Sequence, residues 1–223
     1  MITRALADLQ ALADPAKSAE AAAYHKADRP YLGIKVPQID DLADQWRAEC
    51  SLEDRIQLAA DLWQTNIHEA RIAAAKLLTQ ARIRPDEAAW DLICQWVPQF
   101  DAWAIADHAC IAAQKRITAD PARIDTVEGW TTHPNMWTRR ATLVATLPFT
   151  KQNFPKPFEV EIRERVLGWA AIYIDDKEWF IQKAVAWWLR DLSKHDPART
   201  AAFLEQHGER MKPFARKEAA QYL

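Results

Sequence analysis

Trp103 and Asp107 are the first residues whose types and spacing point to chemistry. Four residues make about one turn of an α-helix, so the indole and the carboxylate project from the same face. Neighbours such as Ala104 and Ile105 are apolar, so a carboxylate that faces inward here needs a partner or a purpose. An anion beside an aromatic ring suits a cation; the alternative is a buried Trp with an exposed helix carboxylate.

A second stripe combines aromatic and cationic side chains late in the chain. Its members recur at helical positions i, i+4, i+7 and i+11: Lys183, Trp187, Arg190 and Lys194. A ring among three positive charges suits a polyanion, and a solvated amphipathic helix is the alternative. Trp137, three residues before Arg140, repeats the pairing of indole and cation. If these helices face one groove with Trp103, the pattern indicates chemistry on nucleic acid.

The charge balance argues against a uniformly basic surface. The 223 residues carry 29 Lys and Arg against 31 Asp and Glu, a formal net charge of -2. Residues 1–112 carry 11 basic and 17 acidic side chains, a net of -6, whereas residues 113–223 carry 18 and 14, a net of +4. A cationic surface is therefore expected in the second half of the chain.

Cysteine and histidine spacing indicates neither a disulfide framework nor a metal site. Cys50, Cys94 and Cys110 form no CxxC pair, and the six His are scattered, so we interpret the histidines as surface or packing residues. The N-terminal segment lacks the apolar core of a signal peptide, and no run of about 18 apolar residues occurs. We expect a protein of a reducing, bacterial-type cytoplasm, associated with the nucleoid when bound to DNA.

Helix signals extend over the whole chain and predict an all-α fold. Only four Gly occur, and no segment alternates apolar and polar residues as a strand does. Start and stop signals predict about a dozen helices, over residues 2–13, 15–26, 37–48, 52–64, 67–80, 86–97, 101–116, 121–131, 135–147, 157–174, 178–194 and 197–222, the last with a break near Pro213.

Chain length favours a right-handed α-solenoid of about six HEAT-like helical pairs over a bundle. Helices that carry Trp recur 34 to 50 residues apart, around the period of roughly 40 to 47 residues of such repeats. We expect a single domain over residues 1–223, with a bend or exposed loop at residues 147–158. Ser51 followed by Asp54 resembles a capping box at the start of one helix.

Five segments carry a more specific pattern. They are YHKADRPYLGIKVPQI (24–39), LWQTNIHEARIAAAKLL (62–78), FDAWAIADH (100–108), MWTRRA (136–141) and FIQKAVAWWLRDLSK (180–194). Over about residues 20–195 the chain resembles the AlkD-like DNA alkylation repair glycosylases, which are built of HEAT-like helical repeats. The last segment and the spacing from Tyr24 to the LGI sequence are the most specific parts of this resemblance.

The resemblance implies that Asp107 is the catalytic carboxylate, that Trp103 and Trp187 line the site, and that Tyr24 lies near the lesion. One position departs from many relatives, which carry an acidic residue directly after the site Trp, where this chain has Ala104. On a helix this position points away from Asp107, so the change affects packing or capping more than the reaction. The alanine at this position leaves open the alternative that the protein is a paralogue that binds DNA without catalysis.

For DNA binding, the resemblance implies that an arginine of the MWTRRA segment holds backbone phosphate. Arg139 and Arg140 are both candidates, and we favour Arg140 because it lies on the face of Trp137. The cations of the late stripe are expected to neutralise further phosphates without reading sequence. The resemblance also implies a concave solenoid surface that grips the DNA backbone and holds the lesion base in no recognition pocket.

The expected activity is that of a monofunctional DNA glycosylase, which releases positively charged N3- or N7-alkylated purines from duplex DNA in base excision repair. The expected partner is double-stranded DNA that contains alkylated purines. We expect a monomer that needs no metal, organic cofactor, membrane or obligate protein partner. The alternatives are a catalytically inactive DNA-binding paralogue and a HEAT-like protein–protein interaction scaffold, the latter favoured by the net negative charge.

Overall fold

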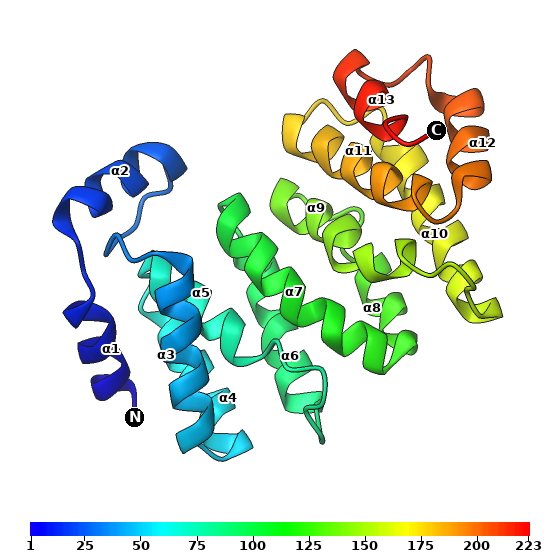
Figure 1. The fold of residues 1–223 in the computed structure, drawn as a ribbon. Helices are drawn as coiled ribbons and strands as arrows, with labels where there is room; N and C mark the ends of the chain where they lie inside the picture. The colour runs from blue at the N-terminus through cyan, green and yellow to red at the C-terminus, as the bar shows by residue number, and fades with distance from the viewer. The chain divides into compact units, whose positions relative to one another are not determined.

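The structure, a computed structural model, describes residues 1–223 and contains thirteen α-helices, three 3₁₀ helices and no strand (Figure 1). The predicted all-α fold is confirmed. The chain forms two compact units, residues 1–116 and 117–223. The predicted single domain and the handed, concave solenoid concern the two units together and stay predictions. None of the helices combines the length and apolarity that a membrane span requires.

The first unit consists of paired helices around an alanine-rich centre. Its helices are α1 (Ile2–Ala11), α2 (Pro15–His25), α3 (Val36–Glu49), α4 (Leu52–Gln64), α5 (His68–Leu77) and α6 (Glu87–Trp96), followed by the 3₁₀ helix η1 (Val97–Gln99) and the start of α7 (Trp103–Ala119). Helix α5 packs against both α3 and α4. Ala70, Ala73 and Ala74 on α5 are fully buried, and their small side chains let both neighbours approach closely.

Tryptophans form much of the core of the first unit. The rings of Trp63 and Trp96 stack in parallel with centroids 4.3 Å apart. The indole N–H of Trp63 donates to Gln99 Oε1 at 3.0 Å, and that of Trp46 donates to Asp8 Oδ2 at 2.9 Å. These bonds satisfy the indole N–H groups of Trp63 and Trp46 within the unit.

In the second unit the helices gather around α11. The elements are η2 (Pro121–Arg123), α8 (Ile124–Glu128), α9 (Met136–Ala145), η3 (Leu147–Thr150), α10 (Pro157–Tyr173), α11 (Trp179–Ser193), α12 (Pro197–His207) and α13 (Pro213–Ala219). Helix α11 packs against α9, α10, α12 and α13. Its inward side is apolar, and Trp188 and Leu189 are fully buried.

Most predicted helix bounds agree with the structure to within three residues, and the prediction for residues 52–64 coincides with α4. The predicted helix 121–131 was wrong in its extent, since it consists of a 3₁₀ turn and a short helix that ends at Glu128. The predicted break near Pro213 separates α12 from α13. Residues 147–158 contain the buried η3 helix and then a loop in which Phe154 is exposed.

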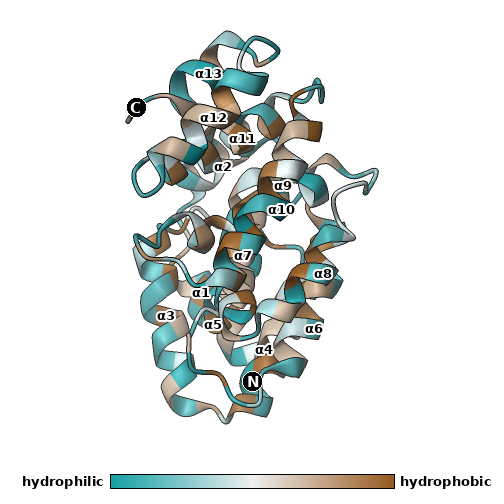
Figure 2. Ribbon diagram, turned by 90° about the vertical axis from the view of Figure 1, so that its right-hand side faces the viewer, coloured by the Kyte–Doolittle hydropathy of each residue, from teal (hydrophilic) through white to brown (hydrophobic).

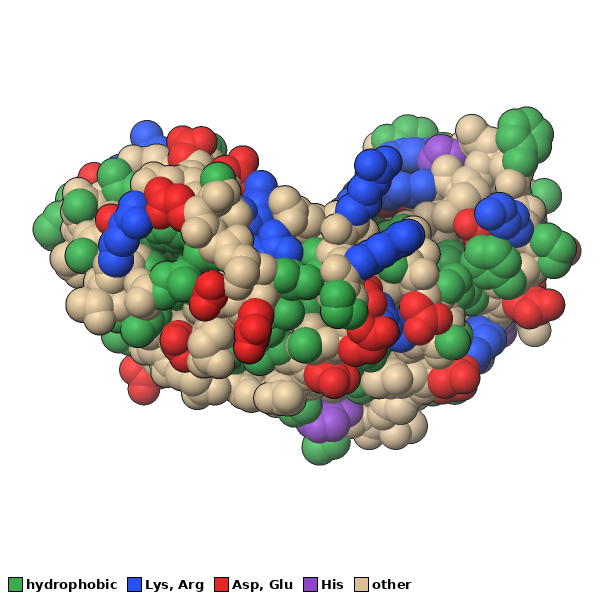
Figure 3. All heavy atoms as spheres, turned by 90° about the horizontal axis from the view of Figure 1, so that it is seen from below, with side chains coloured by type: hydrophobic (Ala, Val, Ile, Leu, Met, Phe, Trp, Pro, Cys, Tyr) green, Lys and Arg blue, Asp and Glu red, His purple; other side chains and the backbone are tan.

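Individual helices are amphipathic, and hydrophilic and hydrophobic residues alternate along their ribbons in Figure 2. On the face that Figure 3 shows, acidic and basic side chains are interspersed, in agreement with the near-neutral net charge. The predicted cap at Ser51 is confirmed, because its hydroxyl accepts a hydrogen bond from the backbone N–H of Asp54 at 3.1 Å.

Candidate active site and nucleic-acid interface

Helix α7 presents Trp103 and Asp107 on one face. Trp103 is the first residue of the helix, and Asp107 follows one turn later. Both side chains are partly exposed, whereas Ala104, Ile105 and Ala106 between them are buried. The shared face predicted from the spacing therefore points away from the core. Because Ala104 is buried, its methyl group acts in packing, as the helical geometry predicts.

The indole of Trp103 lies in contact with two rings from the end of α2. The Tyr24 ring meets it edge to face with centroids 6.1 Å apart, and the His25 ring lies at 5.4 Å. Tyr24 is 69% exposed, so its ring is available to a ligand that approaches Trp103. The structure thus brings Tyr24, Trp103 and Asp107, which the sequence predicted as site residues, into one part of the first unit.

Two histidines extend this aromatic cluster into the protein. The rings of His25 and His68 have centroids 4.4 Å apart, and Tyr31 lies 4.8 Å from His68. The six His are scattered along the sequence, but in the structure the rings of His25 and His68 lie side by side, and His25 lies next to Trp103. No local sequence signal links them, because His25 ends α2 and His68 begins α5.

Burial keeps both imidazoles uncharged at neutral pH. It lowers the pKa of His68 to about 3, and the nearby His25 and Arg29 act in the same direction. Burial also lowers the pKa of His25. On the next turn of α7, burial lowers the pKa of His108 to about 4, with a further contribution from Lys76. The ring cluster beside Trp103 is therefore electrically neutral and does not repel a cation.

The loop between α2 and α3 is held in place by hydrogen bonds from two helices. The buried carboxylate of Glu69 accepts from the backbone N–H of Leu32 at 2.9 Å and of Gly33 at 2.8 Å. The hydroxyl of Ser18 donates to the carbonyl of Tyr31 at 2.6 Å. Gly33 has φ of +77°, and a Cβ there would lie 2.4 Å from the carbonyl oxygen of Asp14. Only glycine fits this position without strain.

The same loop is linked to the start of α7. The side chain of Arg29 is completely buried and forms an ion pair with Asp101, two residues before Trp103. The pair joins the segment that carries Tyr24 and His25 to the helix that carries the indole and the carboxylate. It therefore positions Trp103 relative to the ring cluster.

In the second unit, Trp137 and Arg140 lie on one face of α9. The Arg140 guanidinium carbon lies 5.9 Å from the centroid of the Trp137 ring, and the Phe180 ring packs against that ring at 4.6 Å. Arg140 is 5% exposed. The prediction that Arg140 shares the Trp137 face is confirmed; its contact with phosphate stays a prediction.

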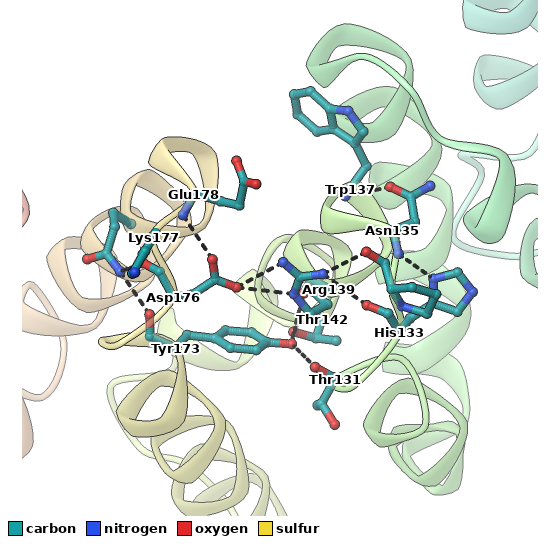
Figure 4. A network of polar contacts seen from close by, with 12 residues as sticks. Thr131, His133, Asn135, Trp137, Arg139, Thr142, Tyr173, Asp176, Lys177 and Glu178 are labelled. Atoms are coloured by element: carbon teal, nitrogen blue, oxygen red, sulfur yellow. Dashed lines mark hydrogen bonds and ion pairs between the residues drawn. The ribbon is translucent and has the colours of Figure 1, made fainter.

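Arg139 lies at the centre of a polar network (Figure 4). Its Nε and Nη2 atoms donate to Asp176 Oδ2 at 3.1 and 3.0 Å, and Nη1 donates to the carbonyl oxygens of His133 and Pro134, each at 3.0 Å. Tyr173 joins the network through its hydroxyl, which donates to the carbonyl of Thr131 at 3.0 Å. Burial raises the pKa of that hydroxyl to about 12. Arg139 thus has a structural role in this network.

The predicted stripe on α11 forms one partly exposed face. Its side chains are all at least partly exposed, whereas the intervening Ala184, Val185 and Ala186 are buried. Trp187 belongs to this face, and Trp188 is fully buried in the core. The 3.6-residue period therefore correctly separates the two adjacent indoles.

The cations of this stripe have counter-charges within the unit. Glu218 on α13 accepts from Lys183 Nζ at 2.8 Å and from Arg190 Nη1 at 2.6 Å. Lys194 Nζ lies 3.7 Å from Asp191 and 4.7 Å from the centroid of the Tyr222 ring. The sequence pattern does not predict the contacts of Glu218 and Tyr222, because helix packing brings them to α11 from about 30 residues away.

The predicted site residues thus fall into three local groups. The first unit brings together Tyr24, Trp103 and Asp107, and the second unit holds one group on α9 and one on α11. No group of three or more His, Cys, Asp or Glu side chains is arranged to hold a metal ion. The catalytic and binding roles of these residues stay predictions.

Comparisons with known proteins place the chain in a family. The model of the family described as DNA alkylation repair enzyme matches residues 5–223. A solved structure described as a predicted DNA alkylation repair enzyme from Enterococcus faecalis is similar with a TM-score of 0.79 and 22% identity, covering 95% of this chain and 96% of that chain. AlkD2 from Streptococcus mutans is similar with a TM-score of 0.61 and 17% identity, covering 84% and 89%.

The identities of the two solved structures to this chain are low, so these structures support the helical-repeat fold and nothing beyond it. A comparison with curated proteins gave no match. The family model spans almost the whole chain and includes the aromatic cluster of the first unit and the cationic stripe of the second. This chain therefore belongs to the DNA alkylation repair enzyme family.

Proposed function

We propose that this protein is a monofunctional DNA glycosylase that releases N3- and N7-alkylated purines from duplex DNA in base excision repair. One observation carries the proposal: Asp107 and Trp103 share a partly exposed face of α7, next to a neutral cluster of rings. A carboxylate beside aromatic rings stabilises positive charge.

The chemistry follows from the charge of the substrate. An N3- or N7-alkylated purine carries a positive charge, so its N-glycosidic bond is already weakened and the base leaves without a general acid. As the bond breaks, the deoxyribose gains oxocarbenium character. Asp107 stabilises that charge and orients the attacking water. The reaction ends with a free base and an abasic site, and the scheme draws on no metal or organic cofactor.

The aromatic rings stabilise a cation without adding positive charge of their own. The faces of Trp103 and Trp187 favour a nearby cation by about 0.5 to 2 kcal/mol per contact. His25 and His68 are neutral because burial lowers the pKa of each, so they add no repulsion toward a cationic base or sugar. Tyr24 supplies an exposed ring on the same part of the first unit.

The cations of the second unit serve binding. Arg140, Lys183, Arg190 and Lys194 contact backbone phosphates and set the position of the DNA without reading its sequence. Arg139 supports this surface from its network with Asp176 and so contributes indirectly. Selectivity comes from the chemistry of the leaving group, because only bases that are already good leaving groups depart.

The test is base release from duplex DNA that contains N7-methylguanine, scored as abasic sites. We expect release by the wild type, and at least about 100-fold slower release by Asp107→Asn with duplex binding retained. Asp91→Asn is a matched control, since Asp91 is exposed on α6 in the same unit and its replacement removes the same charge. It is expected to release base at the wild-type rate.

The same assay separates the alternatives. Duplex binding without base release indicates the inactive DNA-binding paralogue, which the alanine at position 104 favours. Absence of duplex affinity even in low salt indicates a protein-binding scaffold. Undiminished release by Asp107→Asn rejects the assignment of this carboxylate.

A further inference from the structure

Glu218 bridges two cations of the α11 stripe. One carboxylate oxygen lies 2.8 Å from Lys183 Nζ and the other lies 2.6 Å from Arg190 Nη1. The side chains of Lys183 and Arg190 remain 37% and 28% exposed, while that of Glu218 is 16% exposed. The two cations therefore face both an internal carboxylate and solvent.

This bridge resembles the contact that a phosphodiester would make. A phosphodiester has two non-bridging oxygens that share one negative charge, as the two oxygens of a carboxylate do. Lys183 and Arg190 hold one oxygen of Glu218 each. The same two cations suit a single backbone phosphate of duplex DNA.

The helix that carries Glu218 is fixed, so only its side chain can leave the cations. Ala215 and Ala219 of α13 are fully buried, and α13 packs closely against α11. At the start of α13, the Phe214 ring stacks on Trp179 of α11 with centroids 6.1 Å apart. The carboxylate is thus held next to the cationic stripe by the packing of α13.

The stripe as a whole is only weakly cationic. Lys194 lies 3.7 Å from Asp191, and Arg190 Nε lies 3.9 Å from the same carboxylate. Three cations, Lys183, Arg190 and Lys194, therefore face two carboxylates, Glu218 and Asp191, which leaves a formal charge of +1. Carboxylates of the same unit therefore neutralise most of the positive charge of this proposed phosphate-binding surface.

We propose that Glu218 is an internal counter-ion of the DNA-binding stripe, which occupies Lys183 and Arg190 in place of a backbone phosphate and so limits affinity for duplex DNA. The inference rests on the proposed function and adds a residue that controls the strength of binding. A lower affinity for undamaged duplex lets the protein leave each non-specific site and continue its search.

Glu218 affects DNA binding in two opposite ways, and the larger effect decides whether it strengthens or weakens binding. The carboxylate orders Lys183 and Arg190, which favours phosphate binding, but partly exposed ion pairs typically change an equilibrium constant by only about two- to threefold. It also removes one positive charge from the binding surface. One phosphate contact contributes about eightfold to affinity between 1 M and 0.1 M salt. The loss of charge is the larger effect, so Glu218 weakens binding.

The experiment measures binding to a short undamaged fluorescent duplex by anisotropy, between about 50 and 300 mM salt. Glu218→Gln keeps the shape of the side chain and removes its charge. At about 0.1 M salt we expect it to bind about three- to fourfold more tightly than the wild type, with a salt slope steeper by about 0.9. Thermal unfolding of each variant shows that the fold is retained.

Glu205→Gln is the matched control, because Glu205 is exposed on α12 and its replacement changes the net charge equally. Its affinity is expected to stay within about twofold of the wild type, since salt screens distant exposed charges.

The outcomes distinguish this inference from the proposed function. If the wild type binds duplex DNA and Glu218→Gln binds it equally or more weakly, the counter-ion role of Glu218 is overturned, and the proposed function is unaffected. An equal gain from Glu205→Gln overturns the counter-ion role as well, because the effect then follows from net charge. If neither the wild type nor Glu218→Gln binds duplex in the lowest salt, both the proposed function and this inference are rejected.

Discussion

The buried guanidinium of Arg29 forms an ion pair with Asp101, two residues before Trp103. This contact connects the loop after α2 to the start of α7. The loop follows directly on Tyr24 and His25, whose rings lie against Trp103. The position of the indole therefore depends on a charge pair that contains none of the predicted site residues.

Asp101→Asn is expected to lower both stability and base release. The substitution leaves the fully buried Arg29 side chain facing a neutral amide, at a cost of about 1 to 3 kcal/mol. Base release is expected to fall several-fold, because the Trp103 indole loses its fixed position. Denaturant unfolding and the N7-methylguanine assay measure the two effects. Asp28→Asn, an exposed position on the same loop, should leave both unchanged, and an equal effect there would refute the role of the ion pair.

Gly33→Ala is expected to destabilise the loop between α2 and α3. Its φ of +77° is unfavourable for alanine, and the new Cβ would lie 2.4 Å from the backbone atoms Asp14 O and Ser18 N. We expect a loss of at least about 2 kcal/mol in the free energy of unfolding. Gly168→Ala is the matched control, since it lies in α10 with no atom within 4 Å of an added Cβ, and should stabilise by about 0.5 to 1 kcal/mol. Equal effects at the two glycines would contradict this account.

Stability is expected to fall on acidification below pH 6.5. The pKa of His68 is lowered from 6.5 to about 3 in the folded state, so between these values the unfolded chain binds more protons. The contribution of His68 is fully present above pH 6.5 and is lost as the pH falls. Between pH 6.5 and 5 this loss is about 2 kcal/mol. Denaturant unfolding over a pH series measures it.

His68→Phe separates this contribution from those of other groups. It keeps a ring and removes the titration, so the change in free energy of unfolding per pH unit between pH 5 and 6 should decrease by about 1 kcal/mol. A smaller dependence remains, because the pKa values of His25 and His108 are also lowered. A variant with the same pH dependence as the wild type would show that His68 is not held neutral.

The adjacent tryptophans of α11 are expected to respond differently to replacement by alanine. Trp187 is partly exposed, so Trp187→Ala should cost about 1 kcal/mol in stability and slow base release at least tenfold. Trp188 is fully buried, so Trp188→Ala should cost about 3 to 5 kcal/mol by leaving a cavity. Unfolding and base release at a temperature where both variants are folded check the contrast. A normal rate in Trp187→Ala would remove that indole from the site.

The sequence by itself determined the helices and the faces of each helix. Periodicity and capping depend on residues a few positions apart, which is why the Ser51 cap and the separation of Trp187 from Trp188 could be predicted. The shared face of Trp103 and Asp107 follows from the same local geometry. Errors fell at helix ends such as Glu128, where short-range signals compete.

Only the tertiary structure decided which charges and rings meet. Arg29 finds Asp101 72 residues later, His25 meets His68 across two helices, and Glu218 reaches Lys183 from 35 residues away. No periodic pattern encodes such pairs, because they depend on how whole helices pack. The sequence therefore indicated where positive charge and carboxylate lie along each helix, while the packing of α2, α5 and α13 determined which of those charges are neutralised and which rings surround Trp103.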